Sequence, residues 1–222
     1  TDLGQPVARS EALRGKTVAN LFFEPSTRTR ASFDLAAKRL GADVLNLDVN
    51  TSSRKKGESI LDTIYTLQAM QVDAMVVRDA ETGVPAYIAR HVNDFVSILN
   101  AGESDASHPT QALLDLLTIR QHKGAFEGLT VAIVGDIAHS RVARSASEAL
   151  VAMGVNELRL VSPAALAPEP DTVPENAKIM SDLDEGMRDA DVIMALRIQR
   201  ERIGNLDGIP GIDEYFARYG VS

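Results

Sequence analysis

Short apolar runs rich in β-branched residues alternate with segments of helical periodicity along this 222-residue chain. The first run, residues 17–23 (TVANLFF), has the composition of a buried strand. Four apolar residues then recur at the i, i+3, i+4, i+7 spacing of one helix face: Phe33, Ala36, Ala37 and Leu40. A strand–helix order that repeats in this way predicts parallel sheets covered by helices.

The alternation continues to the end of the chain, with one break. Further strands are expected at residues 43–47, 74–77, 95–99, 130–134, 157–161 and 191–196. Helices are expected around 60–67, 86–91, 109–117, 141–153 and 183–188, the third marked by Leu113, Leu116 and Leu117. Glycines flank the segment 123–128 (KGAFEG), which is typical of a domain boundary. We therefore predict an α/β fold of two Rossmann-like lobes, residues 1–123 and 124–222, each a parallel sheet flanked by helices.

Charge and cysteine content exclude several classes of protein. The net charge of −8 argues against a general binder of nucleic acid or of anionic membranes, so an anionic ligand needs a local basic cluster. No apolar run approaches the ~20 residues of a membrane span, and no signal-peptide pattern opens the sequence. The absence of cysteine excludes thiol catalysis, cysteine-based zinc sites and disulfides. We expect a soluble cytoplasmic protein.

The end of the first predicted strand carries the most specific signal. Ligands of open parallel sheets bind beyond the carboxyl ends of the strands, where loops meet helix N-termini. Here the strand is followed by Glu24-Pro25 and then by residues 26–30 (STRTR), three hydroxyl and two guanidinium groups. Free N–H groups and the helix dipole favour an anion at such a place. One Ser or Thr alone is more commonly a helix cap, but a cap needs no arginine. The segment predicts a phosphate site.

Other strand ends of the first lobe add polar groups. Arg78 follows the strand 74–77, although an arginine there can equally be a surface residue. His108 and Gln111 open a helix, where a neutral His can donate to a carbonyl oxygen while the amide holds an NH₂ group. A helix-capping role is favoured for His108 taken alone. The loop 51–57 (TSSRKKG) carries three consecutive cationic side chains. Such a run is usually solvated, but in an acidic chain it points more strongly to an anion-binding role.

The second lobe places Gly135-Asp136 and Arg141 after one strand, and Arg197 with Gln199 after another. The turn lacks the G-x-G-x-x-G pattern, so a nicotinamide site is weakly supported. Two arginines suit a dicarboxylate ligand, although each alone can form a surface salt bridge.

Five segments together resemble, in order and spacing, the catalytic chains of aspartate carbamoyltransferases: FFEPSTRTRASF, NTSSRKKGES, SHPTQALLDLLT, VAIVGD and LRIQRER. The likeness runs from about residue 13 to 221 and is strongest to bacterial chains of the pseudomonad kind. Ornithine carbamoyltransferases are the near competitor within the family. They usually have Lys where Glu24 stands, a cysteine in the HP-x-Q segment and a different amino-acid recognition signature. The residues that favour aspartate as acceptor are Glu24, Thr110, the loop with Ser52 and Lys56, and the pair Arg197 and Gln199.

The resemblance implies roles for individual residues. The residues expected to bind carbamoyl phosphate are Ser26, Thr27, Arg28, Thr29, Ser52, Arg78, His108 and Gln111. Those expected to bind aspartate are Lys56, Arg141, Arg197 and Gln199. The catalytic set is expected to be Arg28, Thr29, Lys56, Arg78, His108 and Gln111. Residues 1–123 then form a carbamoyl-phosphate-binding domain and residues 124–222 an aspartate-binding domain.

The implied reaction transfers the carbamoyl group of carbamoyl phosphate to the α-amine of L-aspartate, an early step of pyrimidine biosynthesis. It needs no cofactor and no metal, because guanidinium and ammonium groups supply the positive field. The family works as homotrimers with shared active sites, so Ser52 and Lys56 are expected to reach a neighbouring subunit, while Glu24 pairs with Arg197 and Arg202. Regulatory or dihydroorotase-like chains are further possible partners; nucleic acid and membranes are not expected.

Both ends of the chain are shorter than the family pattern. Family members continue with a strand, a His-Pro-x-Pro loop and a long final helix that packs on the first lobe, so we expect a fragment of a complete enzyme with apolar surface exposed on that lobe. A shortened protein is the alternative. Three other functions remain open: an ornithine carbamoyltransferase-like enzyme, a non-catalytic assembly subunit, and a plain phosphate- or nucleotide-binding module.

Overall fold

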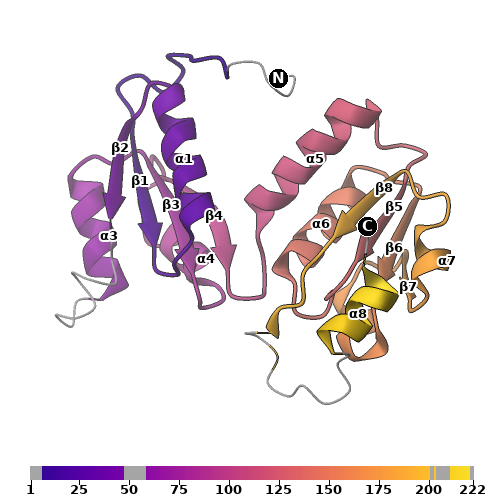
Figure 1. Ribbon diagram of the computed structural model, residues 1–222. Helices are drawn as coiled ribbons and strands as arrows, with labels where there is room; N and C mark the ends of the chain where they lie inside the picture. The colour runs from indigo at the N-terminus through magenta and orange to yellow at the C-terminus, as the bar shows by residue number, and fades with distance from the viewer. Residues whose placement is uncertain (1–6, 48–58, 201–202, 204–210, 221–222) are drawn as a thin grey trace. The chain divides into compact units, whose positions relative to one another are not determined.

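The computed structural model describes residues 7–47, 59–200, 203 and 211–220. The chain divides into two compact units, Thr1–Ser104 and Asp105–Ser222. Each unit contains a four-stranded sheet in which every paired neighbour is parallel, with helices packed on it (Figure 1). The predicted α/β fold of two parallel-sheet lobes is therefore confirmed.

In the first unit the strand order is β2-β1-β3-β4. The strands are β1 (Thr17–Phe22), β2 (Asp43–Leu47), β3 (Ala74–Asp79) and β4 (Ser97–Glu103). The helices are α1 (Thr27–Arg39), α3 (Ile60–Ala69) and α4 (Val84–Ala89). Because β1 is central and β3 lies beside it, Phe22 stands next to Arg78 at the carboxyl ends of the two strands.

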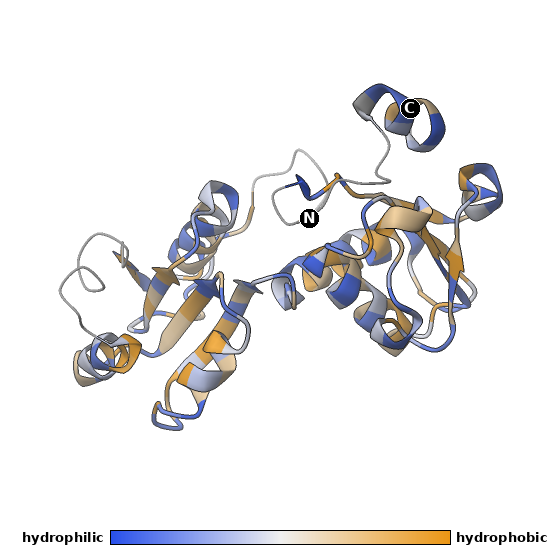
Figure 2. Ribbon diagram, turned by 90° about the horizontal axis from the view of Figure 1, so that it is seen from below, coloured by the Kyte–Doolittle hydropathy of each residue, from blue (hydrophilic) through white to orange (hydrophobic). Residues whose placement is uncertain are grey.

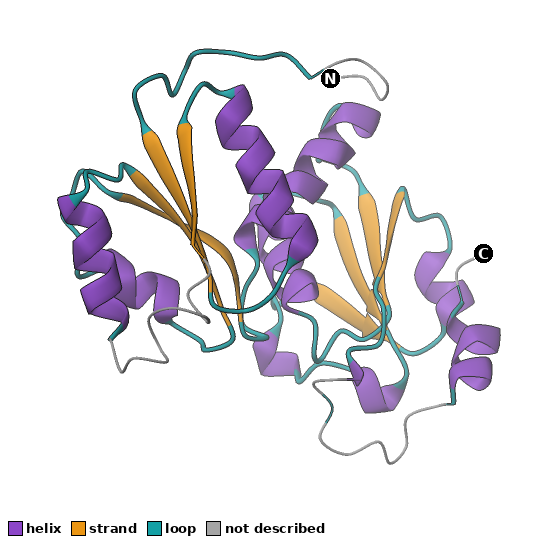
Figure 3. Cartoon of the chain, turned by 60° about the vertical axis from the view of Figure 1, so that its left-hand side comes forward, coloured by secondary structure: helices purple, strands orange, loops and turns teal. Residues whose placement is uncertain are grey.

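Strand alternation divides the core of this unit between the two faces of the sheet. Leu21 packs in the cluster that holds Ile64 of α3 and Ile88 of α4. Its neighbour Phe22 packs in a separate cluster with Ala37 of α1. Successive side chains of a strand point to opposite faces, so α1 covers one face while α3 and α4 cover the other, as Figure 3 shows.

The second unit has the strand order β7-β6-β5-β8. Its strands are β5 (Thr130–Val134), β6 (Glu157–Val161), β7 (Ala177–Met180) and β8 (Val192–Ala195). Its helices are α5 (Pro109–Lys123), α6 (Arg141–Ala152), α7 (Leu183–Met187) and α8 (Ile212–Tyr219), with 3-10 turns at Ala164–Leu166 and Pro170–Thr172. Helices α5 and α6 share a core with one face of the sheet, and α7 packs on the other face. In Figure 2 the strands of both sheets are mainly hydrophobic, whereas the helices carry both colours.

Two sequence predictions were wrong in detail. The strand predicted at 95–99 is Ser97–Glu103, and Phe95 is 61% exposed before it begins. Helix α1 ends at Arg39, so Leu40 sits at its C-cap and is exposed together with Ala36, whereas Phe33 and Ala37 face the core. Leu40 is exposed because the helix has already ended one residue before it.

Helix α5 also buries a different face from the one its leucines predict. Leu113 and Leu117 are 64% and 47% exposed, while Ala112 and Ile119 are buried and Leu116 packs beside them. The neighbour α6 decides which face is covered, because the two helices pack together in one unit. Within the first unit, Leu35, Met70 and Phe95 are exposed apolar side chains.

The boundary between the lobes remains a prediction at 123–128. Contacts divide the chain earlier, after Ser104, because α5 packs on α6 and the Ser145 hydroxyl accepts a hydrogen bond from the His108 backbone N–H at 2.9 Å. Among the described residues, no helix combines the length and hydropathy that a membrane-spanning segment requires.

Candidate active site

The carboxyl ends of β1 and β3 bring the strongest sequence motif beside Arg78. Strand pairing sets Phe22 opposite Arg78, and the Phe23 backbone N–H donates to the Arg78 carbonyl at 2.8 Å. The chain then turns through Glu24 into helix α1. Residues 26–29 therefore begin at the sheet edge next to Arg78, where open parallel sheets bind ligands.

The start of α1 has the properties of an anion site. Ser26 occupies the N-cap position in extended conformation, but its side chain makes no capping hydrogen bond. No acidic residue lies in the first turn, and Arg28 is exposed there. Because the first N–H groups of a helix lack partners within the helix, an anion can accept from them. The capping interpretation of Ser26 is thus not what the structure shows.

The two arginines of the STRTR segment do different things. The Arg30 guanidinium donates to the Leu47 carbonyl at 2.9 Å and lies 5.7 Å from the centre of the Phe22 ring. Arg30 therefore links α1 to the end of β2 and contacts the core. Arg28 is the guanidinium of this segment that the fold leaves exposed.

Arg78 is a buried residue, not a surface one. It is 6% exposed, its Nη2 lies 3.2 Å from Glu24 Oε2, and its Nη1 donates to the Ala101 carbonyl at 3.2 Å. A buried cation requires such partners because burial removes its hydration. Glu24 thus pairs with Arg78 within the first unit. Its predicted pairing with Arg197 stays a prediction, and Arg202 lies outside the described residues.

His108 stands at the N-cap of α5 without capping it. It is 7% exposed, and its side chain makes no capping hydrogen bond, so the helix-capping interpretation is wrong. The Thr110 hydroxyl lies 3.4 Å from its Nδ1. The backbone N–H of His108 is held by Ser145 of α6, which anchors the start of α5.

Gln111 is oriented by a carboxylate one turn further along α5. Its Nε2 donates to Asp115 Oδ1 at 2.9 Å. Burial raises the pKa of Asp115, and the hydrogen bond from Gln111 opposes that rise. With the amide N–H used in this way, the Gln111 carbonyl oxygen is the group that can accept from a ligand NH₂.

The second unit gathers its polar residues at the ends of the neighbouring strands β5 and β8. Val134 pairs with Ala195, so Arg141 at the start of α6 and Arg197 after β8 follow adjacent strands. Arg141 is 6% exposed, whereas Arg197 is exposed and its Nη1 donates to the Ile198 carbonyl at 3.2 Å. Both guanidinium groups therefore belong to one edge of the sheet.

Asp136 is a residue of this edge to which the sequence assigned no role. It is fully buried, and its Oδ2 accepts from the Gln199 backbone N–H at 2.9 Å. Its Oδ1 accepts from the backbone N–H and the ring Nδ1 of His139, at 3.2 and 2.8 Å. The sequence does show that a carboxylate follows a strand and a glycine, which could have marked Asp136 as a residue of the strand end. Its partner Gln199 lies 63 residues away and could not be found from sequence spacing.

The loop residues Ser52 and Lys56 lie outside the described residues, so their predicted roles stay predictions. Over the described parts of the chain, no group of three His, Asp or Glu side chains could hold a metal ion.

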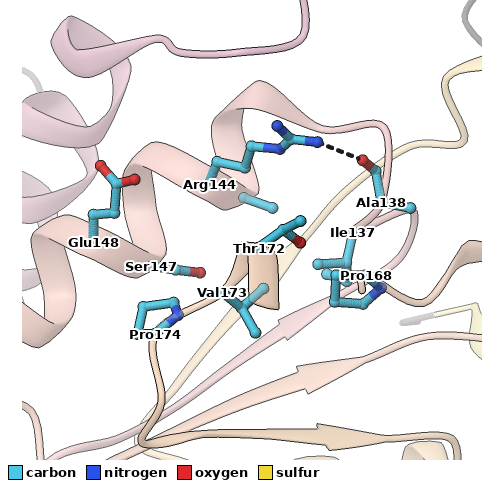
Figure 4. A pocket seen from close by; sticks show the side chains of 10 residues that line it. Ile137, Ala138, Arg144, Ser147, Glu148, Pro168, Thr172, Val173 and Pro174 are labelled. Carbon is cyan, nitrogen blue, oxygen red and sulfur yellow. Dashed lines mark hydrogen bonds between the residues drawn. The ribbon is translucent and has the colours of Figure 1, made fainter. Parts of the chain in front are cut away.

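Two hollows of the second unit do not match the candidate site. A cavity of about 10 Å³ lies beside α6 and has room for about one water molecule. Figure 4 shows the side chains that line it, with Arg144 donating to the Ala138 carbonyl. A hollow of about 600 Å³ between α7 and α8 is lined by Asp182, Asp184 and Arg218, and none of the predicted site residues lies in its lining.

Family models account for both units. Residues 3–121 match the carbamoyl-phosphate-binding domain of aspartate/ornithine carbamoyltransferases, and residues 127–210 match their aspartate/ornithine-binding domain. The chain belongs to the aspartate/ornithine carbamoyltransferase family. The resemblance seen in the sequence is confirmed.

Individual relatives favour the aspartate branch of this carbamoyltransferase family. The chain is 53% identical to an aspartate carbamoyltransferase catalytic subunit of Gluconobacter oxydans over 214 residues, 96% of this chain and 67% of that one. Aspartate transcarbamoylase of Trypanosoma cruzi, solved with carbamoyl phosphate and aspartate, superposes with a TM-score of 0.77 at 34% identity (86% of this chain, 67% of that one). Ornithine carbamoyltransferase of Thermus thermophilus superposes with a TM-score of 0.78 at 31% identity, over 88% of this chain and 66% of that one. The chain thus spans about two thirds of the length of these relatives.

Proposed function

We propose that this chain transfers the carbamoyl group of carbamoyl phosphate to the α-amine of L-aspartate, giving N-carbamoyl-L-aspartate and phosphate. The observation that carries the proposal is the start of α1, an uncapped helix N-terminus placed beside the buried Arg78. The identity to an aspartate carbamoyltransferase catalytic subunit supports aspartate as the acceptor.

The phosphate group is bound at the start of α1. Ser26, Thr27 and Thr29 offer hydroxyl groups there, and the helix N-terminus offers N–H groups and a favourable dipole. Arg28 adds an exposed guanidinium that can bind phosphate oxygens in a bidentate manner. Arg78, held by Glu24 and Ala101, has a guanidinium already oriented at the same strand ends.

Side-chain hydrogen-bond donors polarise the carbamoyl group in this proposal. The amine of aspartate attacks the carbamoyl carbon, the new C–N bond forms, and negative charge develops on the carbonyl oxygen. Thr29, Arg78 and His108 donate to that oxygen, while the Gln111 carbonyl accepts from the carbamoyl NH₂. The C–O bond to phosphate then breaks, the phosphate leaves with the bonding electrons, and the amine proton can pass to it.

Aspartate is bound by the second unit and by the loop that contains Lys56. Arg141, Arg197 and Gln199 follow neighbouring strand ends and carry the charge and hydrogen-bond donors that two carboxylates need. Preorganised positive charge stabilises the developing oxyanion without a side-chain nucleophile. In favourable cases, orientation of the two reactants contributes roughly 7–11 kcal/mol.

The assembly and cellular setting belong to the same proposal. Family resemblance supports a homotrimer in which Ser52 and Lys56 act in a neighbouring subunit's site. It also supports a cytoplasmic enzyme of pyrimidine biosynthesis that can associate with regulatory or dihydroorotase-like chains.

Mixing a Lys56→Ala chain with an Arg78→Gln chain tests whether active sites are shared between subunits. If sites are shared, hybrid trimers regain part of the activity that each variant lacks; mixtures as inactive as their components contradict it.

Isothermal titration tests the reaction itself. The protein is titrated with carbamoyl phosphate and then with a bisubstrate analogue that joins a phosphonate to L-aspartate. We expect the analogue to bind much more tightly than inorganic phosphate. An equivalent analogue that carries L-ornithine separates the two branches of the family. Equal affinity for phosphate and for the aspartate analogue contradicts the proposal and indicates a phosphate-binding half-site.

A further inference from the structure

A bulge in β4 lies directly beside Arg78. Val77 of β3 pairs with Asn100 of β4. The next pair is Asp79 with Glu103, so β3 advances two residues while β4 advances three. Arg78 is the residue of β3 between these two pairs, and it therefore faces the bulge. Bulges commonly redirect a side chain or a carbonyl group next to an active site.

The bulge supplies an oxygen atom that holds the Arg78 guanidinium. Arg78 Nη1 donates to the Ala101 carbonyl at 3.2 Å, and Ala101 is completely buried. Gly102 follows with φ +116°, a conformation that favours glycine. Ser104 has φ +44°, which is uncommon for a residue with a side chain. Two such residues within three positions persist only where the surrounding contacts hold the backbone.

Two side chains of β4 supply contacts of this kind. Asn100 Oδ1 accepts from the Gly102 backbone N–H at 2.8 Å, which closes the bulge around Ala101. Asn100 Nδ2 donates to Glu103 Oε1 at 2.9 Å. Glu103 Oε2 accepts from the backbone N–H of Gly83, the N-cap residue of α4, at 2.7 Å. The half-buried Glu103 carboxylate thus ties the bulge to the segment that follows β3.

A carboxylate suits this place because it has two acceptor oxygens and no donor. A glutamine amide has a single acceptor oxygen, so it cannot accept from both the Asn100 amide and the Gly83 N–H. Hydrogen bonds to an ionised group are also shorter and stronger than neutral ones. Arg78 requires a fixed surrounding, because a donor to a developing oxyanion is most effective when it is held in place before the reaction.

We propose that Glu103 is a positioning residue for Arg78, a role that rests on the proposed transferase function. Glu103 acts through Asn100 and the bulge, which together aim the Ala101 carbonyl at the guanidinium. The group that it positions meets carbamoyl phosphate rather than aspartate. Its loss is therefore expected to weaken binding of carbamoyl phosphate, and only to the extent that Arg78 contributes to that binding.

A double-mutant cycle between Glu103→Gln and Arg78→Gln tests this. The intact protein is titrated with phosphonoacetamide, which carries a phosphonate and an amide in place of the reactive carbamoyl phosphate. We expect Glu103→Gln to lower the affinity by about fivefold or more, within the range for coupled residues. In the Arg78→Gln background the same change is expected to alter affinity by less than about twofold, because the positioned group is gone. In kinetics, the KM for carbamoyl phosphate rises more than the KM for aspartate.

Asp73→Asn is the matched control, since it also replaces a carboxylate by an amide. Asp73 Oδ2 accepts from the Thr17 backbone N–H at 2.8 Å, and Oδ1 accepts from Lys16 Nζ at 2.7 Å. Asp73 thus joins β3 to β1 at the ends of these strands that lie away from Arg78. Affinity for phosphonoacetamide is expected to stay within about twofold of the parent in this variant, even where stability falls.

A second variant covers the case in which Glu103→Gln does not fold. Asn100→Asp keeps an oxygen that accepts from the Gly102 N–H, but it removes the donor to Glu103 and places a second carboxylate beside it. The same Arg78-dependent loss of affinity is expected.

The outcomes separate the two proposals. A parent protein that gains no affinity from the aspartate arm of the bisubstrate analogue overturns the transferase function, and the role of Glu103 with it. A parent that does gain, together with a Glu103→Gln variant that keeps the parent affinity for phosphonoacetamide, overturns only the role of Glu103. A loss of the same factor with and without Arg78 overturns that role as well, because it shows a merely structural effect. Asn100→Asp is judged by the same two results when Glu103→Gln is unfolded.

Discussion

The helix starts of this molecule fall into two groups that differ in how the N-cap side chain is used. At α6 the N-cap residue Ser140 is 2% exposed, and its hydroxyl accepts a hydrogen bond from the Ala143 backbone N–H at 3.2 Å. At α1, Ser26 occupies the same position and makes no such bond. Residue type therefore does not decide the role. A helix start whose N–H groups are satisfied by its own cap stabilises the fold, and one that leaves them available can bind an anion.

The comparison extends to the remaining helices. Ser59 forms a complete capping box with Asp62 at α3, and Asp182 caps α7. His108, at the N-cap of α5, does not cap. Gly83 at α4 and Gly211 at α8 have no side chain that could cap. Among the described α-helices whose N-cap residue has a polar side chain, α1 and α5 are the two without a side-chain cap, and they carry the motifs assigned to carbamoyl phosphate. Four substitutions test whether the capped and uncapped groups differ as this implies.

The largest effect is expected for His108→Ala. Loss of one donor to a developing oxyanion typically lowers turnover by about 10²–10³-fold. Because the imidazole does not cap α5, the circular dichroism spectrum should match that of the parent. Steady-state turnover at saturating carbamoyl phosphate and aspartate is the measurement. His122→Ala, at the exposed end of the same helix, is the control. A His108→Ala turnover within twofold of the parent excludes the role.

Ser140→Ala should mainly affect stability. Loss of an N-cap typically costs about 1–2 kcal/mol of unfolding free energy, and this cap is buried. Urea unfolding at neutral pH measures the change. Affinity for phosphate should stay within about twofold. An unchanged unfolding midpoint would show that the hydrogen bond to Ala143 contributes little.

Ser26→Ala is the reverse case. Its hydroxyl does not cap α1, so the unfolding midpoint should move much less than in Ser140→Ala. Affinity for carbamoyl phosphate should fall by about three- to tenfold, the usual range for one neutral hydrogen bond. Isothermal titration and urea unfolding of the two variants side by side give the result. If Ser26→Ala is the less stable variant and binds normally, the distinction between the two groups fails.

The smallest effect concerns the pH dependence of the capping box at α3. Hydrogen bonds from the Ser59 hydroxyl and backbone lower the pKa of Asp62 in the folded chain below its ordinary value of 3.8. The stabilisation is therefore present above the unfolded-state pKa and is lost as pH falls through the lower folded-state value. Asp62→Asn should reduce stability slightly at pH 7, and the difference from the parent should shrink below pH ~4. A difference independent of pH contradicts the role of the charge.

Local pattern was sufficient for the parts of this fold that depend on neighbours in sequence. Alternation of apolar residues predicted two parallel sheets, and six of the seven predicted strands begin within one residue of their observed starts, as β1 (Thr17–Phe22) and β5 (Thr130–Val134) illustrate. The short strand β7 (Ala177–Met180) was not predicted. The position of STRTR directly after a strand followed from the same periodicity. Backbone geometry is the reason, because side-chain direction repeats every two residues in a strand and every 3.6 in a helix.

Only tertiary structure decided which of several equivalent side chains serves which purpose. Arg30 is committed to the Leu47 carbonyl while Arg28 stays exposed, and nothing in the motif distinguishes them. Leu116 of α5 is covered and Leu113 is not, because α6 packs on one side. Asp136 meets Gln199 across 63 residues because β5 and β8 are neighbours in the sheet. Sequence determined the elements and the chemistry at their ends; the order of strands decided which of those groups meet, since contacts between distant segments leave no local periodicity.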